Sequence, residues 1–244
     1  MLLFLKRSEH QLIELEGNGA RYRLWLDGYF QFDSATERTY HELLVDLPLA
    51  LAEEARSVLI LGGGDGLCAR EALKYPSVER VVNVELDREV ADLALRWPVN
   101  GLNRDSFKDP RVELVIDDAK NYLAGEPEAF DLVVCDFPAP TSPELADLFG
   151  EGFFRKCAGF LAPGGVLSTQ ATMAKGDVKR LRETLRGILG QAISVLSRNR
   201  REDERFVYAS ARPFSKRRDL VDAPAAAPAL ERIASGPVCL AMTR

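Results

Sequence analysis

Apolar and polar positions alternate along residues 11–33 in three short runs. The runs QLIELE, RYRLWL and YFQF begin at residues 11, 21 and 29, and glycines or the pair Asp27–Gly28 separate them. Alternation with a period of two, broken by turn residues, predicts strands joined by tight turns. We therefore expect residues 1–35 to form a small antiparallel β-meander. Residues 36–54 then place apolar side chains at helical spacing and predict a helix.

From Ser57 the pattern changes to apolar strands that alternate with amphipathic helices. The expected strands are SVLILGGG (57–64), VERVVNVELD (78–87), VELVIDD (112–118), FDLVVCDF (130–137), GGVLSTQA (164–171) and FVYASA (206–211). The expected helices are CAREALKY (68–75), EVADLALRW (89–97), residues 144–161 and GDVKRLRETLRGILG (176–190). Continuously apolar strands between helices predict an α/β fold with a doubly wound, mostly parallel sheet. This Rossmann-like, nucleoside-binding domain should cover residues 36–212.

Composition narrows the class of protein without changing this picture. The chain has 244 residues with a net charge of −5 and no long basic block, so nucleic acid is not an expected partner. The four cysteines and two histidines show no metal-ligand spacing, so we expect no metal site. The first apolar run, MLLFL, is too short for a membrane span, and reduced cysteines favour the cytoplasm. The Ala- and Pro-rich residues 213–244 form a segment that the pattern does not place.

A glycine-rich turn follows the first strand of the expected parallel sheet. It reads Gly62-Gly63-Gly64-Asp65-Gly66 and opens a helix. Glycines in this position let the backbone approach a ligand closely. The dinucleotide pattern GxGxxG is not matched, and Asp65 would repel a pyrophosphate. An acid in the turn suits a cationic ligand, such as a sulfonium or an amine.

Acidic residues stand at the ends of the next two expected strands. Glu85, with Asp87 as the next candidate, lies about twenty residues past the glycines, where a carboxylate can accept hydrogen bonds from both ribose hydroxyls. Asp117 and Asp118 end the third strand, where a carboxylate can accept from an adenine amino group. Each acid alone could be a helix cap, but their order at successive strand ends predicts a nucleoside site.

The fourth strand ends at Asp136, at the point where the crevice of such a sheet opens. The segment after it is rich in proline up to about Leu148, and it could cover the site as a lid. Prolines at 138, 140 and 143 predict that this segment is not helical.

The chain resembles the aminopropyltransferases of the spermidine synthase family. The stretches that carry the resemblance occur in family order over residues 11 to about 172: LWLDGYFQF, ERTYHELLVDLPL, VLILGGGDGLCAREALKY, VVNVELD, DPRVELVIDDAKNYL, FDLVVCDFPAP and LAPGGVLSTQA. This resemblance implies a fold like that of class I methyltransferases, preceded by a small β-domain. It also implies a homodimer, since members of the family commonly pair through that β-domain.

The resemblance implies a reaction and a role for each site residue. Decarboxylated S-adenosylmethionine would donate an aminopropyl group to an amine, releasing methylthioadenosine, with no metal required. Asp136 matches the general base of the family, and Tyr40 matches the tyrosine that positions the attacking nitrogen. The other matches belong to the donor pocket: Gln31, His41, Gly62, Gly63, Gly64, Asp65, Glu85, Asp87, Asp117 and Asp118.

One departure from the family pattern concerns the acceptor. The family has a second acid three residues after the base, whereas this chain has Ala139. The loss of that carboxylate leaves the identity of the amine open. Alternatives on the same scaffold are methyl transfer from S-adenosylmethionine, an intramolecular displacement that releases methylthioadenosine, and a homologue without catalytic activity.

Overall fold

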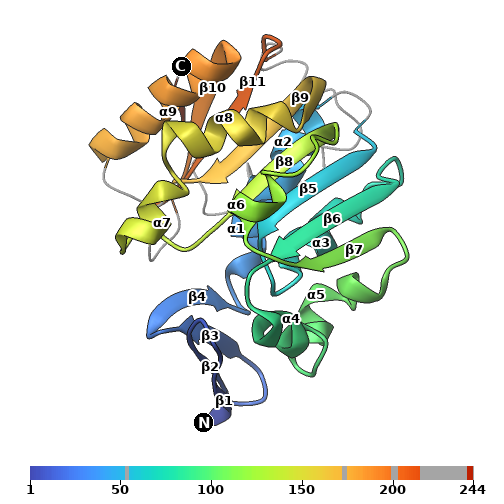
Figure 1. The fold of residues 1–244 in the computed structure, drawn as a ribbon. Helices are drawn as coiled ribbons and strands as arrows, with labels where there is room; N and C mark the ends of the chain where they lie inside the picture. Colours follow the sequence, from blue (N-terminus) through green and yellow to red (C-terminus); the bar gives the residue numbers. More distant parts are fainter. Residues whose placement is uncertain (53–54, 172–174, 199–202, 215–240, 244) are drawn as a thin grey trace.

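The chain folds around two β-sheets. The computed structural model describes residues 1–52, 55–171, 175–198, 203–214 and 241–243. In this part of the chain, a four-stranded sheet at the N-terminus precedes an eight-stranded sheet. Figure 1 shows the small sheet beyond one end of the large one, on the side where the parallel strands end. The predicted α/β class with a small antiparallel β-domain is confirmed.

The N-terminal sheet is an antiparallel meander with one more strand than the pattern predicts. Its strands run in order: β1 (Leu2–Arg7), β2 (Leu12–Gly17), β3 (Tyr22–Leu26) and β4 (Tyr29–Asp33). Asp27 and Gly28 both have positive φ, at 49° and 76°, as a two-residue hairpin between β3 and β4 requires. The alternating side chains Ile13, Leu15 and Leu24 are buried against helices of the large domain.

The large sheet has five parallel strands and an antiparallel edge. Its order is β12-β10-β11-β9-β8-β5-β6-β7, and β9, β8, β5, β6 and β7 are parallel to one another. The bounds are β5 (Ser57–Gly62), β6 (Arg80–Glu85), β7 (Val112–Ile116), β8 (Phe130–Asp136), β9 (Leu161–Gln170), β10 (Gln191–Arg198), β11 (Asp203–Ser210) and β12 (Ala241–Thr243). The strand order reverses between β5 and β8, and such a switch point opens a ligand crevice at the carboxyl ends.

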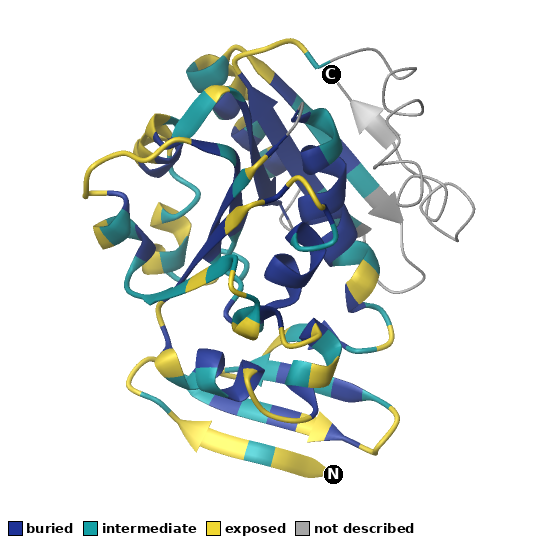
Figure 2. Cartoon of the chain, turned by 90° about the vertical axis from the view of Figure 1, so that its right-hand side faces the viewer, coloured by how far each residue is buried: buried dark blue, intermediate teal, exposed yellow. Residues whose placement is uncertain are grey.

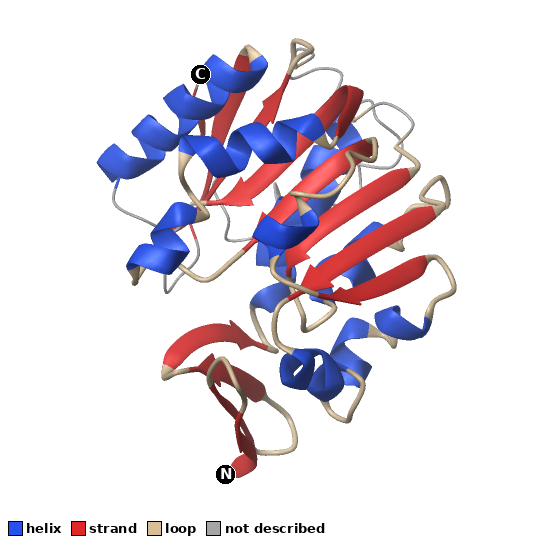
Figure 3. Cartoon of the chain, viewed as in Figure 1, coloured by secondary structure: helices blue, strands red, loops and turns tan. Residues whose placement is uncertain are grey.

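Helices cover both faces of this sheet (Figure 3). Their bounds are α1 (Glu37–His41), η1 (Glu42–Asp46), α2 (Leu47–Leu51), α3 (Leu67–Ala72), α4 (Arg88–Ala94), α5 (Val99–Asn103), η2 (Ser106–Lys108), α6 (Ala119–Tyr122), α7 (Pro143–Asp147), α8 (Glu151–Gly159) and α9 (Lys175–Leu189). Alternate residues of β5 enter two different cores. Ile60 packs with η1 and α3, whereas Leu61 packs with α8 and α9. The sheet is therefore the buried middle layer, as the dark strands of Figure 2 show.

Two predicted helices are interrupted. The helix expected over 36–54 becomes α1, the π-helix η1 and α2; Pro48, in the first turn of α2, has no N–H for the regular bond one turn back. The helix expected over 144–161 divides at Gly150, which has an extended backbone and precedes α8. The proline-rich segment was predicted to be non-helical, yet Pro143 opens α7, because a proline at the first helical position loses no hydrogen bond.

Three strands were not predicted, namely β1, β10 and β12. Most of the predicted C-terminal segment, 213–244, lies outside the described residues, apart from 213–214 and β12, which pairs with β10. The boundaries at 35 and 212 remain predictions. None of the described helices combines the length and apolar character needed to cross a membrane.

Candidate active site

A cavity of about 580 Å³ lies at the carboxyl ends of β5, β6 and β8, a volume typical of small-molecule sites. The N-terminal sheet forms one wall of this cavity, and the segment after β8 forms another. The polar and glycine residues of its lining include Gln31, Tyr40, His41, Gly62, Gly63, Gly64, Asp65, Glu85, Asp118 and Asp136. Most of the site residues expected from the sequence therefore meet in one place.

The glycine turn after β5 brings the backbone against the acids of the neighbouring strands. Gly62 and Gly63 have φ values of 83° and 65°, which favour glycine. A Cβ on Gly62 would lie 2.2 Å from the main-chain oxygen of Asp136, and one on Gly64 would lie 2.5 Å from the Glu85 carboxylate. Side chains at these positions would displace the acids from the cavity.

Glu85 and Asp65 have carboxyl groups with raised pKa values. Burial raises the pKa of Glu85 to about 7, with a smaller contribution from the nearby charge of Asp87. Burial also raises the pKa of Asp65 to about 6, although the charge of His41 acts in the opposite direction. The main-chain N–H of Asp87 donates to Glu85 Oε1 at 2.8 Å and so fixes the orientation of that carboxyl. Both acids thus lose part of their charge as the pH falls to the range of these pKa values.

We expect nucleoside binding to weaken below about pH 7, because ribose hydroxyls donate to the ionised form of Glu85. The ligand-free protein takes up a proton at Glu85 as pH falls, and bound ribose must expel it. Affinity for methylthioadenosine should therefore fall by up to about tenfold per pH unit below that point and be constant above it. Calorimetry at several pH values measures this. In Glu85→Gln the affinity should be lower and much less dependent on pH; an unchanged pH dependence would contradict the assignment.

Asp136 accepts hydrogen bonds on both carboxylate oxygens. The Tyr40 hydroxyl donates to Oδ1 at 2.8 Å, and the Cys68 thiol donates to Oδ2 at 3.2 Å. Burial and the charge of Asp136 raise the pKa values of both donors well above their ordinary range, so both keep their protons. The carboxylate is thereby held in one orientation at the edge of the cavity.

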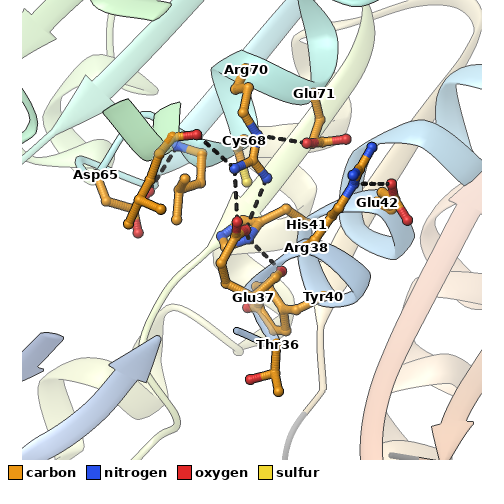
Figure 4. A network of polar contacts seen from close by, with 12 residues as sticks. Thr36, Glu37, Arg38, Tyr40, His41, Glu42, Asp65, Cys68, Arg70 and Glu71 are labelled. Atoms are coloured by element: carbon orange, nitrogen blue, oxygen red, sulfur yellow. Dashed lines mark hydrogen bonds and ion pairs between the residues drawn. The ribbon is translucent and has the colours of Figure 1, made fainter. Parts of the chain in front are cut away.

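A buried network of charges lies behind Tyr40 and His41 (Figure 4). Arg70 donates from Nη1 and Nη2 to the two oxygens of Glu37 at 2.8 and 2.9 Å, and from Nε to Glu71 at 2.7 Å. Nδ1 of His41 lies 2.8 Å from Glu37 Oε2 and 2.8 Å from the Glu37 main-chain oxygen. Both partners are acceptors, so Nδ1 carries a hydrogen.

This network sets the charges of its members. Burial alone lowers the pKa of His41, but the Glu37 hydrogen bond and the negative charges of Asp65 and Asp136 outweigh it and raise that pKa to about 9. Burial acts to raise the pKa of Glu37, but its hydrogen bonds to His41 and Arg70 lower it to about 2. The site therefore contains a fixed ion-pair network next to its titratable acids.

Two predicted site residues do not line the cavity. Asp87 caps α4 through the Glu89 N–H and accepts from Ser8 Oγ at 2.6 Å and from Gln11 Nε2 at 2.9 Å, so it joins the N-terminal sheet to the large domain. Asp117 accepts from the Asp118 N–H.

Two other predicted site residues line the cavity and also form hydrogen bonds that stabilise the local backbone. Asp118 caps α6 by accepting from the Lys120 N–H at 2.7 Å. Gln31 donates to the Tyr29 carbonyl at 3.0 Å, and so the hairpin of the N-terminal sheet fixes its amide.

Comparison with known proteins decides the family. The spermine/spermidine synthase domain matches residues 37–191 of the chain. The chain belongs to this family. A polyamine aminopropyltransferase of Mycobacterium tuberculosis is 43% identical over 173 residues, which are 70% of this chain and 32% of that protein. Polyamine aminopropyltransferase 1 of Pseudomonas aeruginosa is 41% identical over 165 residues, or 67% of this chain and 57% of that protein. The chain therefore spans about a third to a little over half of these relatives.

Solved structures of spermidine synthases share the fold. A spermidine synthase crystallised with the transition-state analogue AdoDATO has a TM-score of 0.80 and 27% identity, over 89% of this chain and 76% of that one. The spermidine synthase of Thermotoga maritima has a TM-score of 0.79 and 28% identity, over 89% and 75% of the two chains.

In this member of the spermine/spermidine synthase family, the structure adds residues to the candidate site that the sequence did not indicate. Cys68 lies in the first turn of α3, and no motif predicts its contact with Asp136. Glu37 and His41 stand four residues apart, a spacing that could have indicated their pairing, but Arg70 comes from another helix. Lys120 and Glu144 also line the cavity.

Proposed function

We propose that this chain transfers an aminopropyl group from decarboxylated S-adenosylmethionine to an amine and releases methylthioadenosine. The observation that carries the proposal is the Asp136 carboxylate, fixed by Tyr40 at the edge of an acidic cavity in a member of the spermine/spermidine synthase family. Acids at the ends of β5, β6 and β8 suit a ligand that carries a sulfonium and an ammonium group.

The reaction needs a neutral amine beside the electrophilic carbon. The amine nitrogen forms a bond to the methylene next to sulfur, and the carbon–sulfur bond breaks with its electron pair moving to sulfur. The sulfonium becomes a neutral thioether, and the proton of the attacking nitrogen passes to Asp136. Tyr40 keeps its own proton and directs one oxygen of Asp136, so its role is positioning.

The remaining acids of the cavity would bind the donor. Glu85 would accept from the ribose hydroxyls, and Asp118 from the adenine amino group. Asp65, with Gln31 and His41 nearby, would face the aminopropyl end. An ammonium there is attracted to Asp65, whereas the carboxylate of S-adenosylmethionine would be repelled. At a separation of about 4 Å near a protein surface, the attraction of an ammonium and the repulsion of a carboxylate differ in interaction energy by several kcal/mol. This difference favours the decarboxylated donor.

We also propose a homodimer that forms through the N-terminal sheet. The edge strand β1 exposes Leu2 and Leu5 at 50% and 55% of their surface, and exposed apolar edges favour pairing with another chain.

The acceptor is the least determined part of the proposal because of Ala139. We expect Ala139→Asp to raise kcat/KM for a diamine by about 3- to 10-fold, since a partly exposed carboxylate near a second ammonium contributes about 1 kcal/mol. Steady-state assays with a diamine and a monoamine of equal length measure the effect. Ala139→Asn is the uncharged control, and the monoamine rate should not rise. Equal gains for both amines would contradict this account.

Mass spectrometry of reaction products tests the function itself. Purified protein is given S-adenosylmethionine or its decarboxylated form, each with a panel of amines and with none. We expect an amine heavier by one aminopropyl group, together with methylthioadenosine, only from the decarboxylated donor. A methylated product, or methylthioadenosine released without an acceptor, would replace the proposal with one of the other reactions. No product from either donor would reject it.

A further inference from the structure

Three potential metal ligands of different chemistry meet at the edge of the cavity. His41 at the end of α1, Cys68 in the first turn of α3 and Asp136 at the end of β8 each place one ligand atom within 4.8 Å of the other two. Cys68 Sγ and Asp136 Oδ2 are 3.2 Å apart. Zn²⁺ binds nitrogen, sulfur and oxygen ligands at about 2.0–2.3 Å, which places ligands of a tetrahedral site roughly 3.3–3.8 Å apart. Small side-chain shifts would therefore satisfy this geometry.

Neighbouring residues already orient two of these ligands. Glu37 engages Nδ1 of His41, so Nε2 is the ring nitrogen left to face a metal. Tyr40 donates to Oδ1 of Asp136, while Oδ2 lies beside the thiol. A carboxylate behind a metal-binding histidine is the usual outer arrangement of zinc sites, because it fixes the tautomer and the ring orientation.

The cavity supplies both an entry path and an open coordination position. His41 and Asp136 line it, and the buried Cys68 thiol lies directly behind Asp136, so a cation that enters the cavity meets two of the three ligands first. Three protein ligands and one position for water is the pattern of zinc sites that keep an open coordination position. The carboxyl groups of Asp65 and Glu85 line the same cavity and attract a divalent cation.

A second cluster of possible metal ligands is less suited to a metal ion. Glu42, Asp46 and Glu71 are buried close together. However, the ammonium of Lys74 already lies among them, paired with Glu71 and 3.7–3.8 Å from Asp46 and Glu42. That cluster already holds a lysine ammonium, whereas the ligands at the cavity edge hold only protons: one on the Cys68 thiol and, because the pKa of His41 is about 9, one on Nε2 of its ring.

We propose that His41, Cys68 and Asp136 form a binding site for Zn²⁺ that is accessible in the donor-free protein and is closed by bound nucleoside. The metal would displace two protons into solvent, one from the Cys68 thiol and one from Nε2 of the protonated His41 ring. It would then bind the thiolate, that nitrogen and the carboxylate oxygen next to the thiol. Asp136 could then no longer accept a proton from an amine, so Zn²⁺ would inhibit transfer. The inhibition rests on the proposed function, but the binding does not.

Metal titration of the whole chain tests the site. Cobalt(II) added to the wild-type protein should give a thiolate-to-cobalt charge-transfer band, and zinc should displace it. Cys68→Ala should lack the band and bind zinc at least about 100-fold more weakly, since loss of an outer-sphere partner alone costs 10- to 100-fold. Cys157→Ala, which removes a buried cysteine of α8, is the matched control and should behave like the wild type.

Two further measurements complete the test. Circular dichroism and methylthioadenosine affinity verify that Cys68→Ala is folded, and saturating methylthioadenosine should expel cobalt from the wild type. A wild-type protein without the charge-transfer band, equal zinc affinity in Cys68→Ala, or cobalt that the nucleoside does not displace would each overturn the site. If the wild type transfers no aminopropyl group, the proposed function fails, while the titration still decides the metal site.

Discussion

Replacing Asp136 with asparagine should lower kcat by about 10²–10⁴-fold, the usual contribution of a general base. Asparagine keeps the shape of the side chain and can still accept from Tyr40, whose hydroxyl lies 2.8 Å from Oδ1. It cannot take a proton from an amine. The loss should therefore appear in kcat, while affinity for methylthioadenosine, measured by calorimetry, stays nearly unchanged.

Asp147→Asn is a suitable control for that experiment. Asp147 is exposed at the end of α7 and pairs with Lys120 at 3.5 Å, so it should keep wild-type kinetics. Wild-type turnover in Asp136→Asn would refute the role of Asp136. A parallel loss of nucleoside affinity would indicate that the substitution disturbs the turn at Gly62 and Gly63, which contacts Asp136.

Replacing Arg70 with alanine should lower the free energy of unfolding by about 3–5 kcal/mol, because it removes the cation that two buried carboxylates, Glu37 and Glu71, share. The guanidinium is only 7% exposed and bridges Glu37 and Glu71, and it also donates to the Leu102 carbonyl. Urea denaturation followed by circular dichroism measures the change. The midpoint should move to lower urea with an unchanged slope.

Arg80→Ala is the matched control for Arg70→Ala. Arg80 also pairs with two glutamates, Glu113 and Glu128, but it is 45% exposed. Exposed ion pairs contribute about 0–1 kcal/mol, so this variant should be almost as stable as the wild type. Equal decreases in the free energy of unfolding in the two variants would show that burial is not the reason why the Arg70 network stabilises the fold.

Strand ends were the most predictable part of the site. Apolar runs fix where β5, β6 and β8 end, and parallel strands bring Asp65, Glu85 and Asp136 to one edge. Hydrophobic pattern was less informative for β1, whose LLFL run has no alternation, because this edge strand is exposed along most of its length. β10 was missed for a related reason, since QAISVLSR mixes polar and apolar residues in a strand near the sheet edge.

Contacts between distant residues were not predictable. Cys68 meets Asp136 only because three positive-φ glycines turn α3 back over the end of β8. Arg70 reaches Glu37 across 33 positions of sequence, and local patterning contains no information at that range. The same limit applies to Asp87: its place at a strand end predicts a ligand contact, but its partners Ser8 and Gln11 lie 79 and 76 positions away in the sequence.

Asp87 also affects how mutations in this domain should be interpreted. Its carboxylate holds Ser8 and Gln11 of the N-terminal sheet, caps α4 and lies two residues from Glu85, whose carboxyl accepts from the Asp87 N–H. A variant at position 87 would therefore alter one wall of the cavity and the orientation of Glu85 at once. Such a variant would bind nucleoside more weakly because the N-terminal sheet and the large domain are misaligned. An affinity measurement alone would not distinguish this cause from the loss of a direct ligand contact.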